Sequence, residues 1–405
     1  MALQIGWVDF SDKDRKRAID VLHLLNDGAM DELGIGVVRD AFANYFFPGT
    51  STIQTRAKYF LIVPYALRMA CSKYPDKPLH QVLAELDRLE KQSAQNMKVN
   101  DEQEGIIGAS VLPKKWVVRK PSSVYWNGIR TLGILKVDNM SMVEAVGTLM
   151  GEFSQKRQRS SGRMRGDESI EGAEDDLNAI GSGKSIWDSW LEYNEDWLYG
   201  LTIDLTKREA AYLRYKISNS EAAKKSLFKF LLDKNISVDG LINGSAKTPF
   251  EALADAINKS VSDEMATMLH IANLFNILVY SLHVRYNLQM GNEEAVDLWK
   301  GVPPMVDSLK ELDLNDMFTR LKITGTFDNF LINSQELLLA GKYDELDDCI
   351  LNRELALKGE KRCKLNDKDR HNETWIGGKW LDYRLMNASR ILKDIYDAEK
   401  GGDNA

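Results

Sequence analysis

The sequence predicts a mainly α-helical protein, with an N-terminal helix-turn-helix or winged-helix-like region followed by a helical bundle. Three observations support this fold class. Apolar residues recur at three- and four-residue spacing along most of the chain. Ser, Thr, Gly and Pro stand where these patterns begin and end, as at helix termini. Two short apolar runs, Ile106–Leu112 and Trp116–Val118, are instead typical of strands and flank Pro113, which predicts a small β-hairpin.

Composition bounds the class of protein. The 405 residues are 44% hydrophobic and carry a net charge of −7, which is typical of a globular protein and compatible with one local basic face. Three scattered cysteines favour a reducing cytoplasm over a disulfide framework. The N-terminus lacks the apolar core of a secretory signal. The most apolar stretch, "MATMLHIANLFNILVYSLHV", contains two His and two Asn residues, so we expect a buried helix and no membrane span.

A change in composition from basic to acidic residues marks a predicted boundary within the chain. Residues 151–185 hold a basic block and then an acidic block with few apolar residues, which predicts a flexible linker between parts at 1–150 and 186–400. Limited proteolysis should separate the two parts there. In an alternative interpretation the basic half contacts a polyanion. The "GSGKS" at Gly181–Ser185 has Asn178 where a phosphate loop needs glycine, so nucleotide binding is not predicted there.

The first part opens with three predicted helices. Ser11 would cap the first helix, and the second covers "VVRDAFANYF". Pro48 and Gly49 form a turn. Ser51 and Gln54 then make a capping box for the third helix, which Pro64 bends or ends.

The third helix carries the first candidate contact. At helical spacing Thr52, Thr55, Arg56 and Tyr59 share a face that differs from the apolar one, so Arg56 should face solvent and Arg56→Ala should barely change stability. These side chains commonly contact phosphates. A merely solvated face is the alternative.

A basic and aromatic segment follows. Between Gly105 and Val137 the chain has six basic residues and no Asp or Glu. Basic charge interleaved with aromatic rings is typical of a nucleic-acid surface. The alternative is that the rings are core and the lysines only keep a hairpin soluble. The predicted nucleic-acid-binding residues are Arg56, Lys114, Lys115, Trp116, Arg119, Lys120, Tyr125 and Arg130.

The second part is predicted to be helical almost throughout. Thr206 with Glu209 and Thr248 with Glu251 are capping boxes. Trp187, Trp190, Tyr193 and Trp197 form an aromatic stripe suited to docking. A long helix near residues 262–290 carries a polar stripe, and Asn276, Tyr280 and His283 are the candidates for a pocket; an interhelical hydrogen-bond network is the alternative.

No metal or cofactor is predicted. The five histidines form no ligand pair with a cysteine or with each other. Asp347, Asp348, Glu354 and Lys358 resemble a nuclease set, but they lie on a predicted helix rather than on strands.

Six segments carry a family resemblance: "WVDFS", "DELGIGVVRDAF", "FPGTSTIQTRAKYFLIVP", "VYWNGIRTLGI", "LTKREAAYLRYKI" and "VYSLHVRYNLQM". With these the chain resembles the uncharacterised bacterial domain-of-unknown-function family 6361. Lys58 and Tyr65 replace Arg and Trp of the usual pattern. The resemblance implies no catalytic residues, and it implies an accessory role near helicases and nuclease-like proteins in bacterial anti-phage defence.

The predicted function is therefore a cytoplasmic, non-enzymatic nucleic-acid-binding or adaptor subunit of an anti-phage system, with DNA as ligand and a helicase or nuclease as partner. Two alternatives stay open at this point. One is a protein scaffold that docks through the aromatic stripe. The other is a hydrolase or ligand sensor that uses the pocket candidates of the second part.

Overall fold

The computed structural model describes residues 32–100, 104–137, 139–163, 185–188, 190–191, 193–242, 247–323, 328–366 and 374–401. Within these ranges the chain is mainly helical, and they contain no strand. The mainly α-helical class is thereby confirmed.

The chain forms two compact units that are interleaved in the sequence. Unit 1 consists of Met1–Ala41 and Thr267–Leu381, and unit 2 of Phe42–Ala266 and Asp382–Ala405. Two helices, α2 (Gly36–Phe46) and α12 (Asp263–Gln289), contain residues of both units. These units cut across the predicted parts.

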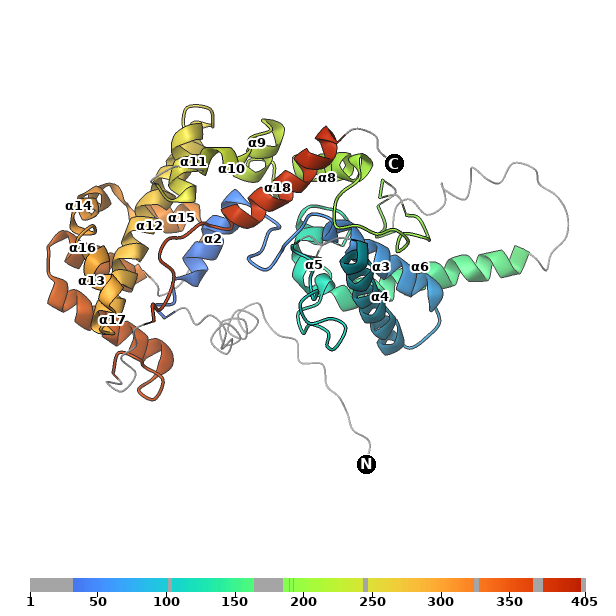
Figure 1. The fold of residues 1–405 in the computed structure, drawn as a ribbon, viewed down its shortest axis with the longest axis horizontal. Helices are drawn as coiled ribbons and strands as arrows, with labels where there is room; N and C mark the ends of the chain where they lie inside the picture. Colours follow the sequence, from blue (N-terminus) through green and yellow to red (C-terminus); the bar gives the residue numbers. More distant parts are fainter. Residues whose placement is uncertain are drawn as a thin grey trace. The chain divides into compact units, whose positions relative to one another are not determined.

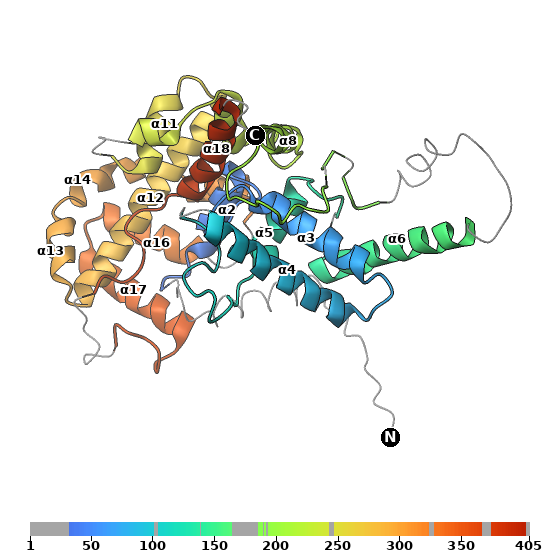
Figure 2. The ribbon, with the colours of Figure 1, turned by 45° about the vertical axis from the view of Figure 1, so that its right-hand side comes forward.

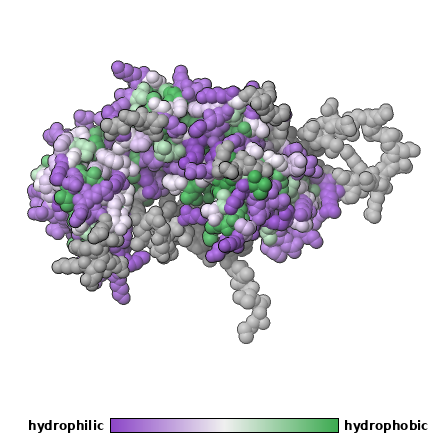
Figure 3. Space-filling view, viewed as in Figure 1, coloured by the Kyte–Doolittle hydropathy of each residue, from purple (hydrophilic) through white to green (hydrophobic). Residues whose placement is uncertain are grey.

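Unit 2 is built around α3 (Tyr59–Lys73), an almost entirely buried helix that contains Pro64. It packs against α4, α5 and α6, and α18 packs against α8 and α9 (Figures 1 and 2). Figure 3 shows a hydrophobic patch among the hydrophilic residues on the drawn face of this unit. The other helices of unit 2 are α4 (Leu79–Asn100), α5 (Pro121–Thr131), α6 (Met142–Arg163), α8 (Lys207–Asn219), α9 (Leu227–Asp233), α10 (Val238–Ile242), α11 (Pro249–Ile257) and α18 (Leu385–Lys400).

Unit 1 contains most of α12 and a series of shorter helices. Neighbours in sequence pack together, α15 on α16 and α16 on α17. By length and composition α12 could cross a membrane, but 72% of its most apolar window is buried inside the protein, as in a core helix. The helices are α13 (Glu293–Trp299), α14 (Pro303–Val306), the 3₁₀ helix η1 (Asp307–Glu311), α15 (Leu314–Arg320), α16 (Asp328–Leu339) and α17 (Tyr343–Lys358).

The predicted β-hairpin is wrong. Residues 107–114 form turns and residues 115–117 have no regular structure, with backbone bonds from Val111 N and Leu112 N to Gly108 O and from Lys115 N to Val111 O. Gly108 has a positive φ of 86°, which lets the apolar run coil on itself instead of extending. Without these strands, the described residues contain no winged helix.

The start of the third helix also differs from the prediction. The turn at Pro48–Gly49 is formed, but α3 begins at Tyr59 rather than after Ser51. Gln54 does reach back to Ser51 N (3.2 Å), but its amide also donates to Gly49 O (3.1 Å), so it closes a loop rather than opening a helix. Pro64 lies within α3 without ending it.

The predicted linker is only partly described. Helix α6 extends through its first residues to Arg163, and residues 164–184, with the "GSGKS" segment, lie outside the described residues, as does the first helix at Ser11. The division of the chain at 151–185 stays a prediction. At Thr206 the predicted capping box is confirmed: Thr206 accepts from Glu209 N, and Glu209 accepts from Thr206 N.

Candidate nucleic-acid interface

The loop at residues 47–58, here called the motif loop, is fixed by α5. The Tyr125 hydroxyl accepts from Thr55 N (2.9 Å) and Arg56 N (3.0 Å) and donates to Arg56 O (2.8 Å). Gly128 is needed opposite this loop, because a Cβ there would lie 2.4 Å from Gly49 O. Two of the segments that carry the family resemblance, "FPGTSTIQTRAKYF" and "VYWNGIRTLGI", therefore form one contact.

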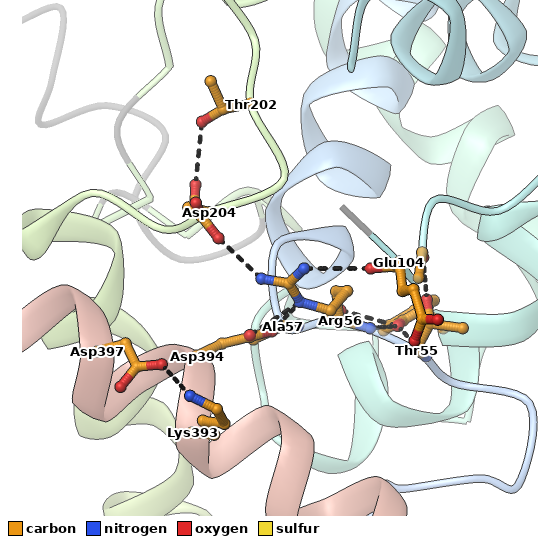
Figure 4. Close-up of polar contacts among 11 residues, drawn as sticks. Thr55, Arg56, Ala57, Glu104, Thr202, Asp204, Lys393, Asp394 and Asp397 are labelled. Carbon is orange, nitrogen blue, oxygen red and sulfur yellow. Dashed lines mark hydrogen bonds and ion pairs between the residues drawn. The ribbon is translucent and has the colours of Figure 1, made fainter. Parts of the chain in front are cut away.

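Arg56 lies at the centre of an ion-pair network (Figure 4). Its Nε donates to Asp394 Oδ1 (2.8 Å) on α18, and its Nη2 to Asp204 Oδ1 (2.8 Å). Asp394 also accepts from Ala57 N at 2.7 Å. Burial lowers the pKa of the Arg56 guanidinium, but the two carboxylates outweigh burial and raise this pKa above its ordinary value.

Lys58 is satisfied in a similar way. Its ammonium donates to both carboxylate oxygens of Glu209 (2.9 and 2.6 Å), the residue of the capping box on α8. A third segment that carries the family resemblance, "LTKREAAYLRYKI", thus contacts the motif loop through Glu209. Three carboxylates therefore hold the motif loop: Asp204 and Asp394 bind Arg56, and Glu209 binds Lys58.

Two predicted contact residues are consequently placed in the interior. Arg56 is 9% exposed and Tyr125 is fully buried, and burial raises the pKa of Tyr125 to about 12. The prediction that Arg56 faces solvent is wrong, because acids distant in the sequence pair with it. Neither side chain presents charge or a ring face to a ligand.

The other predicted cations lie on the segment between α4 and α5. Lys114, Lys115 and Arg119 are exposed, and Val118 between them is 96% exposed. Lys98 on α4 holds the segment by donating to Ala109 O (2.7 Å) and Leu112 O (3.2 Å). We call residues 114–120 the basic loop.

Asp87 on α4 anchors Trp116 and Lys120, the other two predicted contact residues of the basic loop. It accepts from Trp116 Nε1 at 2.9 Å, and Lys120 Nζ lies 2.8 Å from it. The Trp116 ring also packs against Gly108, where a Cβ would lie 2.5 Å from the ring. Trp116 is therefore a half-buried anchor of the loop, and Lys120 shares its charge with Asp87.

A buried carboxyl lies at the base of the basic loop. Glu90 is fully buried and accepts from Ser122 N (2.5 Å) and Ser122 Oγ (3.3 Å) in the first turn of α5. Burial raises the pKa of Glu90 to about 7, although the bonds from Ser122 lower it. Glu90 thus satisfies an N-terminal amide of the helix that follows the basic loop.

Arg130 lies apart from the basic loop, in the last turn of α5. Its guanidinium reaches Met140 O at 3.5 Å and Asn127 Oδ1 at 3.4 Å. The structure therefore divides the predicted nucleic-acid set into an interior pair, the basic loop and this separate cation.

The pocket candidates on α12 bind the chain itself. Asn276 exchanges two bonds with the backbone of Leu381 (3.0 and 2.8 Å), and Asn287 does the same with Ile376 (both 2.8 Å). Tyr280 stacks on Trp380 at 3.8 Å, and His283 packs against Gly377. The side-chain amides act as backbone partners for residues 376–381, so the polar stripe holds a segment of unit 1 in place.

Most of the aromatic stripe is also used internally, and it is not a helix. Trp187 and Tyr193 enclose the Arg68 guanidinium of α3 at 4.6 and 4.7 Å, and Trp197 packs on Tyr65. Trp190 differs, since it is 62% exposed. Sequence spacing carries no signal that would separate this residue from the others.

The acidic residues of α17 have structural partners. Asp347 pairs with Arg285, and the fully buried Glu354 pairs with Lys358 and accepts from Tyr286 OH (2.9 Å). Among the described residues no group of three or more His, Cys, Asp or Glu could hold a metal ion.

Comparison with known proteins supports the resemblance and adds no activity. Residues 2–146 match the model of DUF6361, a family of unknown function, in agreement with the resemblance of the four motifs that fall in this range. The match covers the motif loop, α5 and the basic loop. No curated protein and no solved structure matches the chain.

Proposed function

We propose that the chain is a non-enzymatic nucleic-acid-binding subunit that contacts duplex DNA through the basic loop. The exposure of Lys114, Lys115 and Arg119 on one short segment carries this proposal. The segment from Gly105 to Val137 contains no acid, and Asp87 of α4 contacts Trp116 and Lys120 of the basic loop. Exposed cations of this kind bind phosphates by releasing counterions, which requires no pocket.

An adaptor role in an anti-phage system, beside a helicase or nuclease, is the wider form of the proposal. It follows from the family resemblance and not from a site. The scaffold and pocket alternatives receive less support, because most of the aromatic stripe and the polar stripe of α12 contact the chain itself.

The test is binding of a fluorescein-labelled 20-base-pair duplex followed by anisotropy between 50 and 200 mM NaCl. Charge reversal at Lys114, Lys115 and Arg119 to Glu should weaken binding about tenfold or more. It should also reduce the logarithmic salt slope by about 0.9 for each phosphate that the basic loop no longer neutralises. The matched control reverses three exposed lysines outside the basic loop, at Lys207, Lys225 and Lys259. Equally weakened binding in both variants, or unchanged binding in the first, would contradict the proposal.

A further inference from the structure

A polar cleft of about 730 Å³ lies between the C-terminal ends of α5 and α8 in unit 2. Its base is fixed by two bonds between the helix ends. Lys216 Nζ donates to Gly133 O and Ser220 Oγ to Thr131 O, each at 2.7 Å. Lys216 also pairs with the buried Asp188, so its charge is compensated. The residues that line the cleft include Arg130, Tyr215, Lys216, Ser220 and Glu221.

Arg130 brings an uncompensated cation to this cleft. Its two contacts, at 3.5 and 3.4 Å, are longer than an ordinary N–H···O bond and are made to neutral oxygens. Its Nε is buried without a hydrogen-bond partner among the described residues. A guanidinium held by such weak contacts can donate two N–H groups at once to the oxygens of a phosphate.

A stacked pair of aromatic rings adjoins the same cleft. Tyr215 lines it, and Trp190 stacks on Tyr215 with the ring centroids 4.5 Å apart and the planes 20° apart. Both rings are exposed to water, Trp190 by 62% and Tyr215 by 43%. A half-covered ring stack offers a flat apolar face of the kind on which an unpaired base stacks.

Glu221, the acidic residue that lines the cleft, does not prevent an anion from binding at Arg130. Glu221 lies at the exposed rim, 89% open to water, and Lys224 lies 3.6 Å from it. Asp188 compensates the charge of Lys216, and Lys224 compensates that of Glu221. The positive charge of Arg130 is therefore the one that the cleft offers to a ligand.

We propose that this cleft binds single-stranded nucleic acid, with a phosphate on Arg130 and a base stacked on Trp190. The bases of a duplex are already stacked and cannot reach such a ring, so the site should prefer a single strand. The inference rests on the proposed nucleic-acid function but uses a surface other than the basic loop.

The experiment compares fluorescein-labelled dT20 with the 20-base-pair duplex by anisotropy at 50 mM NaCl. Trp190→Ala should weaken dT20 binding about tenfold, since one stacked base contributes that much, and should change duplex binding less than about twofold. Arg130→Gln should weaken dT20 binding and lower its salt slope by roughly 0.7, the value for one phosphate of a single strand. Tyr199→Ala is the matched control, because Tyr199 is 92% exposed and does not line the cleft.

The outcomes separate the two proposals. If Trp190→Ala and Arg130→Gln, both folded by circular dichroism, bind dT20 as the wild type does, the cleft proposal is overturned. If they lose dT20 while charge reversal of the basic loop leaves duplex binding intact, the cleft stands and the basic loop does not. If the wild type binds neither probe, both proposals fail.

Discussion

Two regions of unit 2 combine lysine or arginine with aromatic residues, and they use them in opposite ways. In the motif loop Arg56 and Lys58 are buried against carboxylates, at 9% and 6% exposure. In the basic loop Lys114 and Lys115 are exposed. The difference comes from acids that are distant in sequence, so a basic and aromatic pattern does not by itself distinguish a structural network from a binding surface.

The largest expected effect is the loss of stability when Arg56, which anchors the motif loop, is replaced. Arg56→Ala leaves Asp394 buried without its cation, and we expect a decrease of about 3–5 kcal/mol in the free energy of unfolding. Urea unfolding of the full chain measures it. Lys115→Ala is the control and should stay within about 0.5 kcal/mol. Were Arg56→Ala to leave stability unchanged and weaken duplex binding, the motif loop would be a contact surface and the distinction would disappear.

The next effect is a pH dependence at the base of the basic loop. The pKa of Glu90 is raised to about 7 from an ordinary 4.5, so the folded chain retains a proton that the unfolded chain loses in this range. The free energy of unfolding should therefore fall as pH rises from about 4.5 to 7, by up to about 3 kcal/mol, and this contribution should be constant above that range.

Urea unfolding between pH 4.5 and 8 measures this slope. Glu90→Gln should remove it, whereas Glu85→Gln should not, since Arg88 lowers the pKa of Glu85 instead. An unchanged slope in Glu90→Gln would mean that Glu90 is ionised throughout the range.

A smaller effect concerns Asp87 of α4, which contacts the basic loop. Asp87→Asn removes a negative charge beside Lys120, and an exposed pair of this kind contributes up to about 1 kcal/mol. If the basic loop binds phosphate, duplex affinity should rise about fivefold at low salt while stability falls slightly. Anisotropy with the labelled duplex measures it. Asp307→Asn, the same charge change at an exposed site in unit 1, should leave affinity unchanged; equal gains would indicate a net-charge effect only.

Some local features could be predicted from the sequence, whereas distant pairings could not. The Pro48–Gly49 turn and the Thr206 cap depend on neighbouring residues, and both are confirmed. The burial of Arg56 depends on Asp394, which lies 338 residues away, and the role of Asn276 depends on Leu381, 105 residues away.

The candidate site shows the same division. Lys114 and Lys115 are exposed, as a contact surface requires, and their binding of nucleic acid stays a prediction. The sequence does not separate Trp190 from the rest of its stripe, because only the fold shows that α3 takes up Trp187 and Tyr193 and not Trp190.

The smallest predicted effect compares two residues with the same sequence signal. Ser51 and Thr206 each precede a Gln or Glu by three residues, which is the pattern of a capping box. Only Thr206 caps a helix, accepting from Glu209 N at 3.2 Å, whereas the buried Ser51 Oγ has no hydrogen-bond partner among the described residues. Thr206→Ala should therefore cost about 1 kcal/mol. Ser51→Ala should be neutral within about 0.5 kcal/mol, because it removes a hydroxyl that stabilises nothing in the fold. Urea unfolding of both variants under one set of conditions measures the two changes in free energy of unfolding. A loss in Ser51→Ala equal to that in Thr206→Ala would show that a helix does begin at Ser51.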